Sequence, residues 1–328
     1  MIPYLLARLA WAMTMVLGLV LLSFVITHLL PGDPIDALVG NFPAPAAYVA
    51  QVRHDFGLDQ SLAEQLRRYA LNLMQGNLGF SFLNRQPVLP LVLHRAGITL
   101  LLMLPALALA ALLGVAMAVW STAHAGRPLD RALTGASLVG YSIPVFWLAQ
   151  LLIMVFAVWL GWLPAQGMYS SGAAKSGVGS ALDLLRHLLL PALCITVFYL
   201  AVVARVARAS MLEMLHQDFV LTARAKGVRQ RGVLWRHVLR NGLIPVITVI
   251  GYNFGQSLTG AILTETVFAW PGLGGLFITS IGNHDYPVLA AIFLLAASMV
   301  VLANLVTDLL YAVADPRVRL AARQARAG

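Results

Sequence analysis

Residues 217–241 form a basic segment inside a strongly apolar chain, and their chemistry suits binding rather than catalysis. The stretch reads QDFVLTARAKGVRQRGVLWRHVLRN. Asp218 is predicted to be an N-cap, because its carboxylate can accept hydrogen bonds from the free amides of a first helical turn. Arg224 and Lys226 suit the negative end of a helix, and Gly227 can adopt the left-handed conformation that ends one. We expect a short docking helix between these marks, with apolar side chains that need cover.

Sequence motifs of nucleotide hydrolysis and of hydrolytic catalysis are missing. There is no GxxxxGK[ST] phosphate loop, no HExxH and no GxSxG. The glycine-rich stretch 268–276, FAWPGLGGL, lacks the strand-to-helix context of a phosphate site and is interpreted as a turn and re-entry element. The one cysteine, Cys194, lies in an apolar run, which excludes a disulfide framework and a cysteine metal cluster. We therefore expect no catalytic, cofactor or metal site in this chain.

Polar side chains inside the long apolar runs form a second group that could bind or conduct a solute. An unsatisfied polar group in hydrocarbon costs several kcal/mol, so each needs a partner or water. Hydrogen bonds between helices are one interpretation, and the lining of a hydrated pathway is the other. Asp308 lies near the end of its run, where pairing with an arginine is an equal alternative. The candidates for the pathway are Tyr141, Ser142, Asn253 and Gln256.

The composition places these candidates in a membrane. Of the 328 residues, 60% are hydrophobic and only 11% are charged, which is more apolar than a soluble core requires. The net charge of +9 does not indicate nucleic acid as a partner, because the basic residues flank apolar runs instead of forming a soluble basic face. The predicted class is an all-α membrane protein in a lipid bilayer.

Six apolar runs are predicted to cross a hydrocarbon core of about 30 Å, and the fourth of them is rather short. The first is too long for a cleaved signal peptide, and PGDP follows it instead of a small-residue cleavage site. The third is so long that it must tilt, kink at Pro144 or begin inside the interface. The six predicted transmembrane helices cover 9–30, 98–120, 132–160, 188–204, 243–264 and 288–314.

The distribution of basic residues orients these spans. With the N-terminus inside, the inner segments carry 15 Lys or Arg and four acids, a net charge of +11. The outer segments carry seven basic and eight acidic residues, a net charge of −1. The positive-inside rule then predicts cytoplasmic N- and C-termini, with residues 217–241 in the cytoplasm.

Four regions follow from this topology. Residues 1–30 hold the N-terminus and the first span, and 31–95 form an extracytoplasmic subdomain. Within that subdomain, Ser61 and Glu64 have capping-box spacing and predict a helix over 62–74. The remaining regions are a five-helix core at 96–314, which contains the cytoplasmic loop 205–241, and a basic tail at 315–328.

The motifs of the loop carry a family resemblance. TARAKG at 222–227, followed after nine residues by HVLRN at 237–241, resembles the cytoplasmic loop of ABC importer permeases, whose pattern is EAA, three residues, Gly, nine residues, Ile-x-Leu-Pro. The form DFVLTARAKG is similar to that of the dipeptide, oligopeptide and nickel branch. Matches in order over nearly the whole chain are PGDP, FGLDQSL, NLGFS, YSIPVFWLAQ, ETVFAWPGLG, DYPVL and NLVTDLLYAVADPR.

This resemblance implies a type I ABC importer permease in a bacterial inner membrane. The short helix would be a coupling helix seated in a separate ATPase subunit, and two such subunits would bind ATP and Mg. A second homologous permease and an extracytoplasmic substrate-binding protein would complete the complex. Leu221 and Arg240 depart from the general pattern, so no acidic contact is assigned. The residues that the resemblance assigns to ATPase docking are Asp218, Phe219, Val220, Leu221, Thr222, Ala223, Arg224, Ala225, Lys226, Gly227 and His237.

The sequence leaves open a different cargo, an ion-driven carrier and a membrane-embedded hydrolase. Peptides fit the branch best, but nickel or other small solutes use similar permeases. An ion-driven secondary carrier would need acidic residues in mid-span, where Asp308 is the one candidate and lies off-centre. The sequence also has no obvious inverted repeat. A membrane-embedded hydrolase would need a nucleophile and a base, and no such constellation is recognisable.

Overall fold

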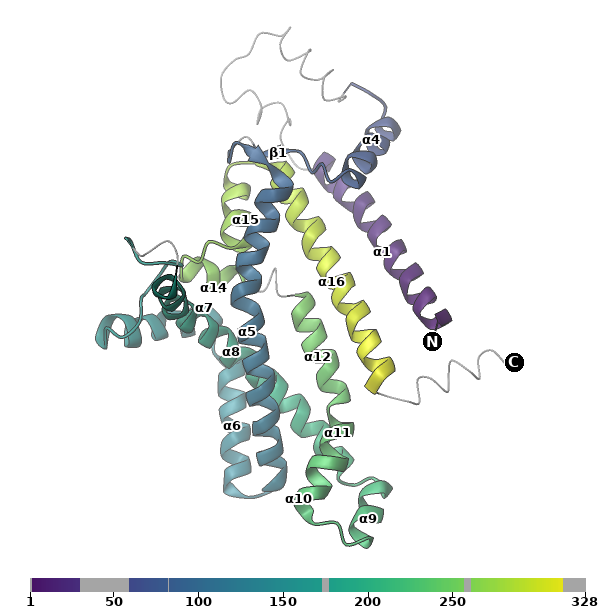
Figure 1. Ribbon diagram of the computed structural model, residues 1–328, viewed down its shortest axis with the longest axis vertical. Coiled ribbons are helices and arrows are strands. Elements are labelled where there is room, and N and C mark those ends of the chain that lie inside the picture. The colour runs from purple at the N-terminus through teal and green to yellow at the C-terminus, as the bar shows by residue number, and fades with distance from the viewer. Residues whose placement is uncertain (1, 30–58, 82, 173–176, 257–260, 315–328) are drawn as a thin grey trace.

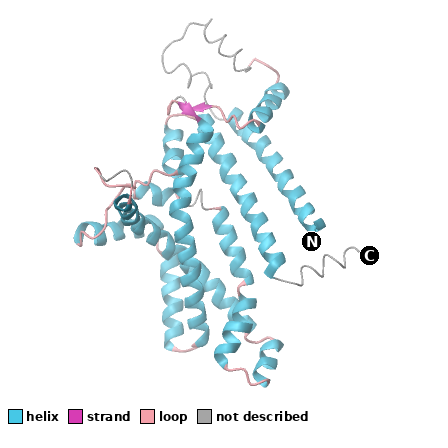
Figure 2. Cartoon of the chain, in the orientation of Figure 1, coloured by secondary structure: helices cyan, strands magenta, loops and turns pink. Residues whose placement is uncertain are grey.

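The computed structural model describes residues 2–29, 59–81, 83–172, 177–256 and 261–314 (Figure 1). The described residues are mostly helical, with one two-stranded hairpin (Figure 2). Within the described residues, four helices are long and apolar enough to cross a membrane, and the number rises to six if each of two bent helix pairs is one span. The all-α class is confirmed. The PGDP motif and the basic C-terminal tail lie outside the described residues.

The centre of the molecule is a pair of long helices, α5 (Val88–Ala123) and α8 (Val178–Met214), which pack along each other (Figure 1). A Cβ at Gly114 of α5 would lie 2.9 Å from Val203 of α8, so the absence of a side chain permits this approach. The predicted fourth span, 188–204, is only the apolar middle of a 37-residue helix. The prediction was too short because charged residues interrupt an apolar run, although they are compatible with a continuing helix.

A second group of helices packs around α16 (Tyr286–Ala314). α16 is flanked by α1 (Ile2–Leu29) and by α12 (Ile244–Gly255). Arg8 of α1 pairs with Asp308 of α16 at 3.0 Å, so Asp308 has the arginine partner that was one of its two predicted roles.

The predicted third span is sharply bent. α6 (Pro128–Ser142) meets the helix formed by α7 (Val145–Leu152) and η1 (Ile153–Trp159) at 100°. The bend lies at Pro144, one of the three predicted alternatives. Proline lacks a backbone N–H and disfavours helical geometry in the residue before it, and Ile143 is accordingly extended, with φ −74° and ψ 124°.

The predicted helix of the outer subdomain is present as α4 (Leu62–Met74). Ser61 is its N-cap and accepts a hydrogen bond from the Glu64 amide at 3.4 Å, as the capping-box spacing predicts. Hydrogen bonds from Arg67 and Arg68 lower the pKa of Glu64 to about 2. The strands β1 (Phe80–Ser81) and β2 (Gln86–Pro87) pair antiparallel between α4 and α5.

The predicted fifth span, 243–264, is not one continuous helix. α12 ends at Gly255, and α14 (Ile262–Val267) is a separate short helix. A turn then leads into α15 (Leu273–Gly282), so the turn predicted from the glycine-rich stretch is present.

That turn wraps a buried carboxylate. Glu265 is 1% exposed, and its two oxygens accept hydrogen bonds from the Thr99 hydroxyl and the Gly274 amide, each at 2.6 Å. A Cβ at Gly272 would lie 2.5 Å from the Thr99 hydroxyl and would also meet Glu265, so a side chain there would block the approach. The glycines therefore bring the backbone close to a carboxyl group supplied by the chain itself. This arrangement ties α14 and α15 to α5.

We expect Glu265→Ala to destabilise the protein. The Thr99 hydroxyl and the Gly274 amide would remain buried without their acceptor, at a cost of about 1–3 kcal/mol for each group. The measurement is the midpoint temperature of heat unfolding of the purified protein. Glu64→Ala is the matched control, because that carboxylate binds arginines on the exposed surface of α4 and its loss leaves the midpoint unchanged. Equal midpoints for the two variants would contradict the buried role of Glu265.

Candidate docking site at the basic end

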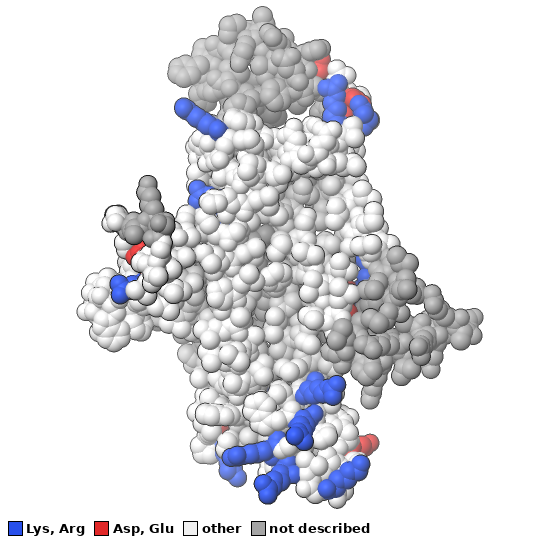
Figure 3. All heavy atoms as spheres, viewed as in Figure 1, with Lys and Arg blue, Asp and Glu red and all other residues white. Residues whose placement is uncertain are grey.

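Exposed arginines and a lysine gather at one end of the molecule, around α9 (Asp218–Ala225) and the helices that follow it (Figure 3). Those helices are α10 (Gln230–Gly232), η2 (Val233–Val238) and α11 (Leu239–Gly242). We call this region the basic end. Its exposed cations are Arg224, Lys226, Arg229, Arg231, Arg236 and Arg240.

The two ends of α9 only partly follow the prediction. Gln217, not Asp218, is the N-cap, and it makes no side-chain capping bond. Asp218 lies in the first helical turn, where its charge still suits the positive end of the helix. The predicted stop at Gly227 is confirmed, because this residue has φ +75° and its amide donates to Arg224 O at 2.9 Å. The Val228 amide donates to Ala223 O at 3.2 Å, which completes a Schellman motif.

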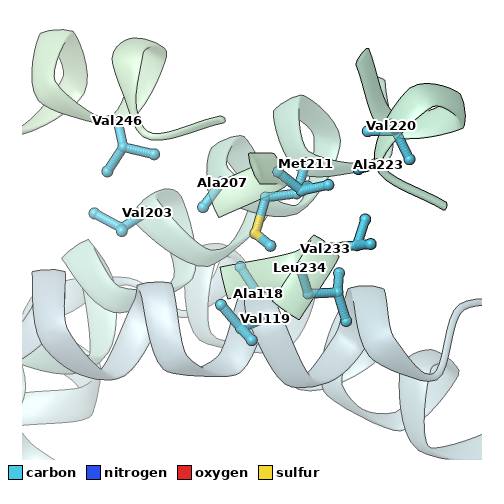
Figure 4. Close-up of a cluster of buried hydrophobic side chains, with 11 residues drawn as sticks. Ala118, Val119, Val203, Ala207, Met211, Val220, Ala223, Val233, Leu234 and Val246 are labelled. Carbon is cyan, nitrogen blue, oxygen red and sulfur yellow. The ribbon is translucent and has the colours of Figure 1, made fainter. Parts of the chain in front are cut away.

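One face of α9 is buried in the chain itself. Val220 and Ala223 are three residues apart, so they lie on the same side of the helix, and both are buried. They pack with Met211 of α8 and with the buried face of η2 (Figure 4). The chain itself therefore supplies part of the cover that the apolar side chains of α9 are expected to need. The cluster, which we call the α9 cluster, comprises Ala118, Val119, Val203, Ala207, Met211, Val220, Ala223, Val233, Leu234, Val238 and Val246.

The opposite face of α9 is exposed. Leu221 is 59% exposed, and an exposed leucine beside charged groups is suited to an interface. Phe219 is half-buried against the α9 cluster. The structure thus divides the predicted docking residues into an inward and an outward set. The outward set is Asp218, Leu221, Thr222, Arg224, Ala225, Lys226 and Gly227.

His237 lies on η2 and not on α9. It is half-buried, and its backbone carbonyl accepts a hydrogen bond from Asn241 at 2.9 Å. Since η2 packs against α9, His237 belongs to the same end of the molecule but not to the exposed face of the short helix.

The predicted pathway residues lie on two separate helices. Tyr141 and Ser142 end α6, while Asn253 and Gln256 lie at the end of α12. The ring of Tyr141 stacks on Phe198 of α8 at 5.7 Å, and the Arg205 guanidinium lies 4.3 Å from the centre of the same ring. Such cation–π contact holds a positive charge beside an otherwise apolar surface.

The other three pathway candidates differ in their surroundings. Ser142 donates to the carbonyl of Leu138 at 2.8 Å within its own helix. It also lines an apolar cleft of about 480 Å³ at the α6–α7 bend, together with Phe146 and Trp147. Asn253 is buried, and Gln256 is the C-cap of α12. Their role as lining of a pathway stays a prediction.

Sequence reasoning missed a buried charged group beside the basic end. Asp130 of α6 binds Arg208 of α8 through two contacts of 2.8 Å. Neither residue belongs to a recognisable motif, and the two are 78 positions apart. No local signal predicts that contact. Within the described ranges, no group of His, Cys, Asp and Glu side chains is arranged to hold a metal ion.

Comparison with known proteins assigns the family. Residues 110–320 match the family described as binding-protein-dependent transport system inner membrane component. Residues 1–103 match the N-terminal region of the same kind of membrane component. The two matches together cover most of the chain.

Named relatives match over almost their full length. The chain is 40% identical to the di/tripeptide transport system permease protein DppB of Pseudomonas aeruginosa (strain UCBPP-PA14), over 97% of this chain and 99% of that protein. It is 37% identical to the dipeptide transport system permease protein DppB of Escherichia coli (strain K12), with the same coverage. The oligopeptide transport system permease protein AppB of Bacillus subtilis (strain 168) is also 37% identical, over 97% of this chain and 99% of that protein.

A solved structure shares the fold. It is an inward-facing conformation of the MetNI methionine ABC transporter, which matches with a TM-score of 0.55 and 16% identity, over 68% of this chain and 96% of that one. The predicted architecture of a type I importer permease is confirmed at the level of the fold. The chain therefore belongs to the family of binding-protein-dependent transport system inner membrane components, which are multi-pass proteins of the inner membrane.

Proposed function

We propose that this chain is a permease subunit of an ATP-driven importer of dipeptides or oligopeptides. The peptide permeases that match over nearly their full length support the substrate class. The observation that carries the mechanism is the two-sided environment of α9. One face of this helix is built into the transmembrane helices, and the other is exposed for a partner.

This arrangement suits the transfer of force. Val220 and Ala223 share the α9 cluster with Ala118 of α5 and Val246 of α12. Because close-packed side chains transmit displacement instead of absorbing it, a partner that pulls on α9 would move α5, α8 and α12 with it. ATP and Mg would bind to the ATPase partners. This chain would only bind the ATPases and transmit their movement to its transmembrane helices.

The complex would need several partners on two sides of the membrane. Two ATPase subunits would bind at the basic end, which we place in the cytoplasm by the positive-inside rule. A substrate-binding protein would approach the opposite end, where α4 and the β1–β2 hairpin lie (Figure 1). A second, homologous permease would complete the pathway, with Tyr141, Ser142, Asn253 and Gln256 as candidates for its lining.

A nickel or other small-solute importer is the nearest alternative, since it would use the same docking and transmission. An ion-driven carrier is less consistent with the structure. Asp308, its one candidate acid, pairs with Arg8 and therefore already has a counter-charge.

Leu221→Arg should abolish assembly with the ATPases. A long charged side chain would replace an exposed apolar contact at the centre of the outward face, while the buried side of α9 would remain intact. We expect the amount of co-purified ATPase to fall at least about tenfold, which corresponds to roughly 1.4 kcal/mol of binding free energy. Leu71→Arg, on an exposed leucine of α4 at the opposite end, is the control and should retain the ATPase. Undiminished co-purification of the Leu221→Arg variant would refute docking through α9.

Uptake by the reconstituted complex tests the substrate and the energy source. We expect a labelled dipeptide to accumulate in proteoliposomes only when ATP, both permeases, the ATPases and the binding protein are present. Accumulation of nickel but not of peptide would favour the alternative cargo. Uptake by this chain alone under an ion gradient would favour the carrier and overturn the proposal.

The orientation can be measured by labelling introduced cysteines in a Cys194→Ala background. Glu213 is exposed at the basic end, and Asn72 is exposed on α4. With a membrane-impermeant maleimide, Glu213→Cys should react in inside-out vesicles and Asn72→Cys in right-side-out vesicles. The reverse pattern would contradict the predicted topology.

A further inference from the structure

A buried charged cluster joins three helices just above the basic end. Asp130 lies in the first turn of α6 and is 3% exposed. Its partners are Arg208 of α8 and Ser121 near the end of α5. The cluster thus connects α8 to two consecutive helices, α5 and α6, that are far from it in the sequence.

The carboxylate of Asp130 is surrounded by donors. Arg208 donates from Nε to one oxygen and from a terminal nitrogen to the other, both at 2.8 Å. Ser121 Oγ donates to the first oxygen, and the Gly126 amide donates to the second at 2.9 Å. Arg208 Nε also lies 2.9 Å from Ser121 Oγ. A planar guanidinium held through two atoms allows one relative orientation of its helix and the partner helix.

The cluster is adjacent to the packing that holds α9. Arg208 follows Ala207 and precedes Met211 by three residues, and both neighbours belong to the α9 cluster. Met211 is fully buried, and a Cβ at Gly242 of α11 would lie 3.0 Å from its side chain. The same stretch of α8 therefore shares the α9 cluster with α9, contacts α11 and is also bound to α5 and α6.

Stability alone does not account for this cluster. Taking an ion pair out of water costs free energy that the attraction of the charges barely repays, and apolar residues of similar volume often stabilise a protein equally well. What the two-atom contact adds is a fixed geometry. That geometry matters where a displacement must pass from one helix to its neighbours without being absorbed.

We propose that Arg208 and Asp130 are positioning residues that lock the basic ends of α5, α6 and α8 into one rigid unit, so that a displacement of α9 moves the transmembrane helices together. This inference rests on the proposed function of α9 as the contact with the ATPases. In the intact complex the lock converts ATP hydrolysis into transport. Without it, α9 moves with α8 while α6 lags behind.

The test compares transport with hydrolysis in the complete reconstituted complex. Arg208→Lys keeps the charge but loses the two-atom contact, and Asp130→Asn keeps the size but loses the charge. For both variants we expect co-purification of the ATPases and the rate of ATP hydrolysis within about twofold of wild type, because neither residue lies on the exposed face of α9. The number of peptides imported per ATP should fall at least about fivefold, because coupling and not binding is impaired. Arg67→Lys, in the exposed pair with Glu64 on α4, is the control and should leave this ratio unchanged.

Two outcomes would overturn the inference. One is an unchanged ratio of import to hydrolysis in both variants. The other is a parallel loss of hydrolysis, import and assembled complex, which would mean that the cluster only supports packing. A failure of the proposed function itself looks different, because the wild-type chain would then not co-purify with ATPases or import peptide.

A distance measurement on the purified full chain tests the lock independently of transport. Spin labels at Arg131→Cys on α6 and Glu213→Cys on α8, both exposed positions, report the distance between the two helix ends in a Cys194→Ala background. The distance distribution should be narrow with the wild-type cluster and broad with Arg208→Lys. An equally narrow distribution in the variant would overturn the lock, whatever the transport assays show.

Discussion

The burial of Val220 and Ala223 in the α9 cluster, together with Met211 of α8, is the packing on which the interpretation of this molecule depends. A helix of eight residues is too short to be stable in water by itself, so α9 exists because its neighbours pack against it. The same packing decides what the helix can do. A helix held only at its ends would yield to a partner, whereas one whose face is part of a packed core carries its neighbours with it. The exposed Leu221 lies on the face that the proposed ATPase partner would contact.

Buried polar contacts join the helices at two places along α5. At the basic end, Asp130 and Arg208 fix the relative positions of α6 and α8. Toward the other end, Glu265 ties the turn between α14 and α15 to Thr99 of α5. In each case a carboxylate satisfies donors from separate helices, which apolar packing cannot do with the same directionality. The long helix α5 takes part in both and so connects the two ends of the molecule.

Glycines and prolines shape the helices between those two places. Gly114 lets α5 approach α8 closely, and Gly272 lets the α14–α15 turn approach Glu265. Pro144 divides the third apolar run into two helices at 100° and leaves the apolar cleft at the bend.

The sequence by itself determined the class, the approximate spans and the family, because hydrophobic run lengths, charge asymmetry and ordered motifs are properties of the chain alone. It also located the capping box at Ser61 and the end of α9 at Gly227, since both depend on neighbouring residues. Only the tertiary structure decided that Val220 points inward while Leu221 points outward, and that Gln217 replaces Asp218 as the N-cap. It alone brought Asp130 to Arg208 and Glu265 to Thr99. These pairs arise from the packing of helices distant in sequence, and neither hydrophobic periodicity nor local spacing carries information about which distant partner a buried charge will meet.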